Sequence, residues 1–162
     1  MPLLVHGDLV LMESRVMLEH LAEYYQFKES YPADLDARSR HRHAMAVIDD
    51  FVVPVLFGRA YADAQRLDDT LRSLEDAVAA TAPQACLLAF HVAPIWLRFR
   101  LWCPAHAVTR AIEARGALCG WFDAANQLDS LKRTAPDPAT HKEDLIRARQ
   151  AAILPSATRR KA

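Results

Sequence analysis

Glu13 and Ser14 are the residues best suited to bind a charged ligand, because they stand side by side at the start of a predicted helix. Met17, Leu18 and Leu21 recur after them at helical spacing. A helix N-terminus presents unpaired N–H groups and a partial positive charge, so it can hold a carboxylate, with the Ser14 hydroxyl as a further donor. The Glu13 carboxylate suits an ammonium group. Together the pair can recognise both charges of a free amino-acid terminus.

A β-hairpin followed directly by a helix is expected to position this pair. Apolar runs at residues 3–5 and 9–11 flank a Gly-containing loop at residues 6–8, which predicts two antiparallel strands. Ser14 then takes the N-cap position of the helix. A simpler interpretation needs no ligand: Ser14 only caps the helix, a contribution of about 1 kcal/mol, and Glu13 is a solvated loop acid.

This stretch resembles the second half of the thioredoxin-like domain of a glutathione S-transferase. It reads Pro-Leu-Leu-Val-His-Gly-Asp-Leu-Val-Leu-Met-Glu-Ser-Arg-Val-Met-Leu-Glu-His-Leu-Ala. In that family a cis-proline introduces the hairpin, and a Glu/Gln-Ser pair at the helix start binds the γ-glutamyl end of glutathione. The resemblance implies that Pro2 is the cis-proline and that Glu13 and Ser14 are the γ-glutamyl contacts. It also implies that the main chain of Met1 binds the cysteinyl backbone of glutathione.

The family's thiol-activating unit is missing from this sequence. Family members begin with a strand, a helix and a second strand, and this unit carries the Tyr, Ser or Cys that activates the glutathione thiol. The catalytic residue is therefore unknown here. Because the family often has Val before the proline, our hypothesis is that Met1 is a GTG codon read as a start, in a gene truncated or begun too late. In-frame upstream DNA encoding the unit would support this, whereas a stop codon directly upstream would make the short form genuine.

The rest of the chain predicts a mainly α-helical protein. The resemblance continues loosely along it and implies an all-helical C-terminal domain behind a hairpin-plus-helix remnant of a thioredoxin-like α/β domain. We expect the partial thioredoxin-like domain at residues 1–27, the helical domain at 28–154 and a flexible basic tail at 155–162. Four Gly residues in 162 agree with a helical chain.

Apolar spacing and turn residues predict the individual helices of the second domain. The strongest signals are a stripe formed by Leu67, Leu71, Leu74 and Val78, a nearly all-apolar segment at 85–103 that should be the central helix, and a short stripe formed by Leu118, Trp121, Phe122 and Ala125. Pro54 predicts a kink or a stop in the helix that begins near Asp34 or Asp36. Pro104 is expected to open a helix that Gly116 ends, and Thr140 to cap a last helix to about Ala152.

Three polar features of this domain are predicted to be structural. Residues 40–43, Arg-His-Arg-His, should form a solvated basic face, because His41 and His43 point to different sides and cannot share a metal ion. In a dimer of the family type, Arg38 or Arg42 would approach the glutathione carboxylates. His91 is expected to be a core histidine with a hydrogen-bond partner. The thiols of Cys86, Cys103 and Cys119 have no metal spacing and suit burial in a reducing compartment.

Charge and hydropathy indicate a soluble cytoplasmic protein, and the spacing of the His and Cys residues predicts no bound metal. Twenty basic and twenty acidic residues cancel, which favours neither nucleic acid nor a membrane as partner. No apolar stretch reaches membrane length. The resemblance implies a homodimeric glutathione S-transferase that uses glutathione as co-substrate and a small hydrophobic electrophile as second substrate, with activity impaired by the missing unit. The alternative is a non-catalytic interaction or dimerisation module of the same fold.

Overall fold

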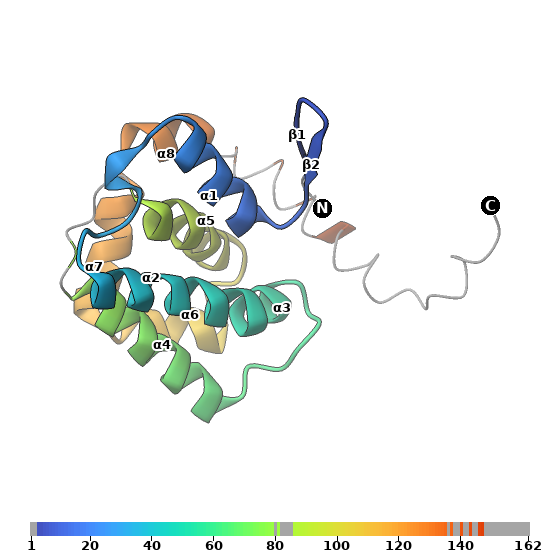
Figure 1. Ribbon diagram of the computed structural model, residues 1–162. Coiled ribbons are helices and arrows are strands. Elements are labelled where there is room, and N and C mark those ends of the chain that lie inside the picture. Colours follow the sequence, from blue (N-terminus) through green and yellow to red (C-terminus); the bar gives the residue numbers. More distant parts are fainter. Residues whose placement is uncertain are drawn as a thin grey trace.

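Helices make up most of the chain, and a two-stranded antiparallel sheet precedes them (Figure 1). The computed structural model describes residues 3–79, 81, 86–135, 137, 140, 143, 146 and 147. The elements are β1 (Leu4–His6), β2 (Leu9–Leu11), α1 (Ser14–Tyr24), a 3₁₀ turn (Lys28–Ser30), α2 (Leu35–Val47), a π-helical segment (Ile48–Val52), α3 (Val53–Leu56), α4 (Ala64–Val78), α5 (Leu87–Trp102), α6 (Ala107–Glu113), α7 (Gly116–Ala125) and α8 (Asp129–Thr134).

The predicted hairpin is confirmed, and it stands out from the helical body (Figure 1). β1 and β2 pair antiparallel, with Val5 opposite Val10, and Gly7 takes a φ of 60° in the turn between them. Glycine adopts this left-handed conformation without steric penalty, which is why the loop can be so short. Strand alternation puts Leu3, Val5, Val10 and Met12 on one face, called here the outer face of the hairpin, and all four side chains are more than half exposed.

α5 is the central helix of the body, as its apolar sequence predicts. It contacts α1, α2, α6 and α7, and its residues Leu88, Ala89 and Phe99 are fully buried. Its N-cap residue, Cys86, makes no side-chain capping bond. The packing of neighbouring helices, rather than a cap, therefore stabilises its start. α1 joins the hairpin to this body through its buried residues Met17 and Ala22.

The helix that contains Pro54 does not stop before that residue, because helical structure continues to Leu56. α2 runs into a π-helical segment, in which the N–H of Val53 donates to the carbonyl of Ile48, five residues earlier. Proline lacks the N–H that would bond the Asp50 carbonyl, and its ring would clash with that carbonyl in a regular α-helix. The wider π turn accommodates the proline. Arg66 Nη2 lies 3.4 Å from the Asp50 oxygen and donates to it from α4.

Two helix boundaries were predicted wrongly. α6 begins at Ala107 rather than at Pro104, because His106 acts as the N-cap and its Nδ1 accepts the N–H of Val108 at 3.2 Å. Gly116 opens α7 instead of ending α6, whose C-cap is Ala114. The stripes predicted for α4 and α7 are confirmed. The helix expected from Thr140 to Ala152 falls mostly outside the described residues.

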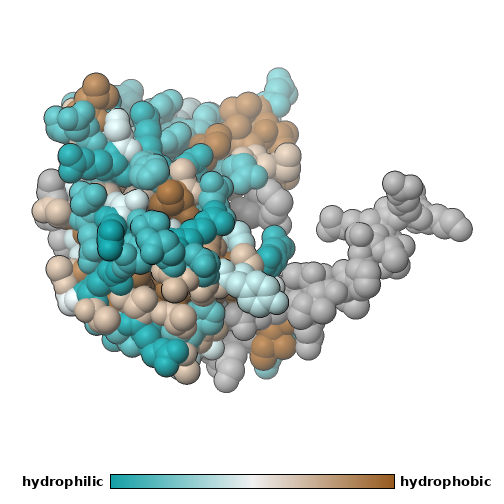
Figure 2. All heavy atoms as spheres, turned by 90° about the horizontal axis from the view of Figure 1, so that it is seen from below, coloured by the Kyte–Doolittle hydropathy of each residue, from teal (hydrophilic) through white to brown (hydrophobic). Residues whose placement is uncertain are grey.

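Hydrophilic residues predominate on the face seen from below, and the largest group of hydrophobic residues in this view lies at its upper right (Figure 2). Within the described ranges, the helices are too short or too polar to cross a bilayer.

Candidate functional site

Glu13 and Ser14 lie where the sequence places them, between the hairpin and α1. The structure corrects their roles in the helix start: Glu13 is the N-cap residue, and Ser14 is the first residue of the helix rather than its cap. Glu13 makes no side-chain capping bond, and both residues are exposed. Among the described residues neither side chain has a hydrogen-bond or ion-pair partner, so both polar groups are available to a ligand.

The backbone of Glu13 is strained. Its φ is 76° and its ψ is 109°, outside even the small left-handed region that some side chains adopt. Asn, Asp and His are the usual non-glycine residues at positive φ, and glutamate is not among them. A conformation of this kind costs on the order of 1–3 kcal/mol and is concentrated at binding and catalytic sites.

The start of α1 has the electrostatics of an anion site. The N–H of Met17 donates to the Glu13 carbonyl at 3.0 Å, so the N–H groups of Ser14, Arg15 and Val16 precede the first helical bond. No acidic residue lies in the first turn of α1 itself, and Glu13, at the N-cap, is the acidic residue next to these N–H groups. A carboxylate can therefore bind these N–H groups while an ammonium group binds Glu13. Met1 and Pro2, the other residues of the predicted glutathione site, lie outside the described residues.

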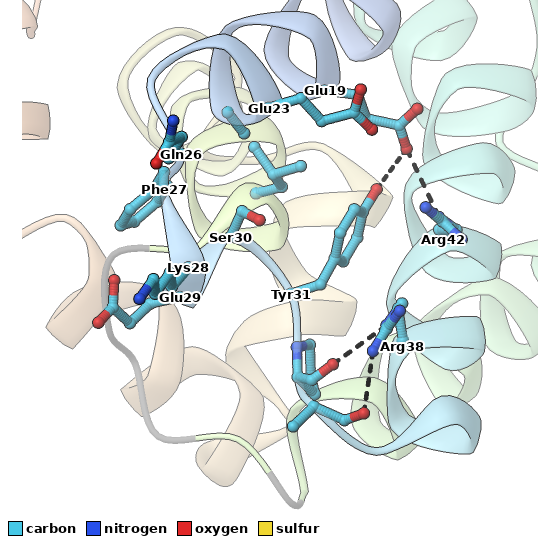
Figure 3. A pocket seen from close by; sticks show the side chains of 14 residues that line it. Glu19, Glu23, Gln26, Phe27, Lys28, Glu29, Ser30, Tyr31, Arg38 and Arg42 are labelled. Atoms are coloured by element: carbon cyan, nitrogen blue, oxygen red, sulfur yellow. Dashed lines mark hydrogen bonds and ion pairs between the residues drawn. The ribbon is translucent and has the colours of Figure 1, made fainter.

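A cavity of about 590 Å³ lies away from this junction, beside the C-terminal half of α1 (Figure 3). Glu19 and Glu23 of α1, the segment from Gln26 to Ala33, and Arg38 and Arg42 of α2 line it, with Leu87 from α5. Neither Glu13 nor Ser14 is among its lining residues. It is therefore separate from the site that the sequence predicts.

Tyr31 forms the centre of a polar cluster in this cavity (Figure 3). Its hydroxyl donates to Glu19 Oε1, and the Arg42 guanidinium lies 4.7 Å from the centre of its ring. Arg42 Nε is also 3.6 Å from Glu19 Oε1. Burial, followed by the hydrogen bond to Glu19, raises the pKa of Tyr31 to about 12. The phenol therefore stays protonated at neutral pH and ties α1 to α2.

Arg38 lies at the other side of the cavity and binds the chain that precedes α2. Its Nε donates to the Pro32 carbonyl at 3.2 Å and its Nη2 to the Ala33 carbonyl at 2.9 Å. Both arginines that were considered for the glutathione carboxylates, Arg38 and Arg42, are thus engaged within the protein. They line the cavity rather than the Glu13–Ser14 junction.

The prediction of a solvated basic face at residues 40–43 is wrong for His41. Its side chain is fully buried, and its Nε2 lies 3.0 Å from Thr81 Oγ1. Burial lowers the pKa of His41, which keeps the ring neutral. The sequence did not reveal this because His41 stands between two exposed arginines, and only the packing of α2 against α4 and α5 shows which side faces inward. His91 is confirmed as a buried histidine, and its Nε2 lies 2.9 Å from Asp49 Oδ1. This contact lacks hydrogen-bond geometry, so the hydrogen-bond partner that the sequence predicts is not shown.

Cys86 and Cys119 are not set up for thiolate chemistry. Cys86 is buried, and this burial raises the pKa of its thiol. Burial, with a contribution from Asp123, also raises the pKa of Cys119. A nucleophilic cysteine needs the opposite shift. In the described part of the chain, His, Cys, Asp and Glu side chains nowhere gather in groups of three or more that could hold a metal ion.

Comparison of the sequence with protein-family models finds no match, and comparison with curated proteins finds none either.

Proposed function

We propose that this chain is a glutathione S-transferase-like protein whose Glu13–Ser14 junction binds the γ-glutamyl end of glutathione. One observation carries the proposal: an unpaired glutamate is held at a strained φ of 76° directly before an exposed serine and the free N–H groups of α1. A strained residue at a helix start, with side chains that have no structural partner, supports a binding role.

Each charge of the γ-glutamyl group has a matching group at this junction. The α-carboxylate of the ligand would accept from the Ser14 hydroxyl and the first N–H groups of α1, and its ammonium group would donate to Glu13. Hydrogen bonds to charged groups contribute about 1.5–3 kcal/mol each. Loss of one such bond should therefore weaken binding about tenfold or more.

The finer features of the proposal follow from the family resemblance. The mainly helical body behind a hairpin supports a glutathione S-transferase-type helical domain at residues 28–154 and a partial thioredoxin-like unit at 1–27. We propose that the protein is a cytoplasmic homodimer and that its second substrate is a small hydrophobic electrophile, which accepts the glutathione sulfur. The catalytic group is not assigned, because the family's activating Tyr, Ser or Cys precedes the hairpin.

The exposed hairpin favours a second candidate, a non-catalytic interaction module. The outer face, formed by Leu3, Val5, Val10 and Met12, is apolar and exposed. A two-stranded sheet also leaves the outer edge of each strand unpaired, and isolated hairpins are only marginally stable. Association with another polypeptide would cover these groups.

Calorimetric titration with reduced glutathione tests the binding proposal. We expect Glu13→Gln and Ser14→Ala each to weaken binding about tenfold or more, and the dipeptide Cys-Gly, which lacks the γ-glutamyl group, to bind much more weakly than glutathione. Asp36→Asn is the matched control, because Asp36 is an exposed acid in the first turn of α2 and should leave affinity unchanged. Equal affinities for the two ligands, or unchanged affinity in both junction variants, would refute the proposal.

A turnover assay with a generic aryl halide separates the two candidates. Binding of glutathione without conjugation supports the interaction module. Conjugation by the purified chain supports the enzyme and shows that the chain contains an activating group that the resemblance does not supply.

A further inference from the structure

His6 and His20 connect the hairpin to α1 through their ring nitrogens. His6 Nδ1, on β1, lies 2.9 Å from His20 Nε2, on α1. The ring centroids are 5.2 Å apart and the ring planes are inclined by 63°. The pair lies at the surface of the molecule, where a dissolved ion can reach it.

We propose that His6 and His20 form a two-histidine site for a late first-row divalent metal ion, with Cu(II) bound most tightly. Imidazole nitrogens suit copper, nickel and zinc, and Cu(II) ranks highest among the divalent ions of this series. Metal–nitrogen bonds of about 2.0–2.1 Å at a right angle place two ligand nitrogens about 2.9 Å apart. The observed separation of the two nitrogens also equals that of adjacent nitrogen ligands in a tetragonal Cu(II) complex, so the ion would replace the hydrogen bond that now joins the two rings.

Tyr24 holds the rings of this pair in place. Its ring packs edge-on against His6, with centroids 4.4 Å apart, and stacks with His20 at 6.4 Å. Tyr24 lies one helical turn after His20, so the same face of α1 carries both. Binding breaks the hydrogen bond between the rings, and a small rotation of each ring then points both nitrogen lone pairs at the ion. Water fills the remaining positions of the ion, since the described residues provide no third His, Cys, Asp or Glu ligand there.

This inference is independent of the glutathione proposal, because neither Glu13 nor Ser14 takes part in it. The two histidines are 14 residues apart, which matches no local metal-binding spacing. The pair is recognisable only once the hairpin has folded against α1.

Titration of the metal-free full-length chain with copper(II) sulfate tests the site. We expect one tight equivalent and an electron paramagnetic resonance spectrum of tetragonal Cu(II) with splitting from two nitrogens. His6→Ala and His20→Ala should each weaken binding at least tenfold and remove the two-nitrogen pattern. His43→Ala is the matched control, an exposed histidine outside the pair, and should bind like the wild type.

A second measurement on the wild-type chain covers the case in which a variant does not fold. Substoichiometric Cu(II) should broaden the NMR signals of residues 6 and 20 before those of His43 and His91. Unchanged affinity in both alanine variants, or first broadening at another histidine, would overturn the proposal and indicate adventitious copper only.

Discussion

Replacing Glu13 by glycine should stabilise the fold and weaken the proposed binding about tenfold or more at the same time. Glycine reaches positive φ without the steric penalty of a Cβ atom. Relief of the strain at φ 76° contributes about 1–3 kcal/mol. The greater freedom of glycine in the unfolded chain offsets about 0.4–1 kcal/mol of this. The net expectation is a stabilisation of about 0–2.6 kcal/mol, with each kcal/mol raising Tm by about 2–4 °C.

Glu13→Ala is the control that isolates the backbone effect. It removes the same carboxylate but keeps a Cβ atom at the same φ, so its free energy of unfolding should stay within about 0.5 kcal/mol of the wild type, as for other exposed side chains. Urea unfolding followed by circular dichroism measures all three proteins. If the Glu13→Gly variant is no more stable than the Glu13→Ala variant, backbone strain at Glu13 is refuted. Both variants should lose affinity for glutathione, which separates the role of the side chain from that of the backbone.

Two further predictions concern the helical body. His41 has a lowered pKa, so between that pKa and the unfolded value of about 6.5 the unfolded chain binds more protons. The neutral His41 ring contributes fully to the free energy of unfolding above pH 6.5. This contribution is lost as the pH falls, and the free energy of unfolding then decreases by up to about 1.4 kcal/mol per pH unit. His41→Leu should flatten this slope in urea unfolding between pH 7 and 5, and an unchanged slope would assign it to other groups. Tyr31→Phe removes the hydroxyl that donates to Glu19 but keeps the ring under Arg42, so it should destabilise the protein by about 0.5–1.5 kcal/mol. A more stable Tyr31→Phe variant in the same assay would contradict the structural role of this bond.

Short sequence patterns predicted the helices and strands that depend mainly on neighbouring residues. The Gly7 turn between two apolar runs predicted the hairpin, and the spacing of Leu67, Leu71 and Leu74 predicted α4. The start of α6 was missed because the histidine ring of His106 replaces the usual Ser, Thr, Asp or Asn cap.

Features that depend on tertiary packing were not predictable in the same way. The sequence placed Glu13 and Ser14 at a helix start, but no residue preference indicates a positive φ for glutamate. The cavity around Tyr31 combines Glu19, 12 residues earlier, with Arg42 of α2, and it exists only once these segments pack together. The contact between His6 and His20 has the same origin.

An NMR titration of the isotope-labelled chain with glutathione tests the central claim most directly. If the junction binds the γ-glutamyl group, the amide signals of residues 13–16 should shift first and saturate together. The signals of Phe27 and Tyr31, which line the separate cavity, should stay in place at the same concentrations. Shifts centred on that cavity, or none at residues 13–16 when the ligand is in large excess, would contradict the account.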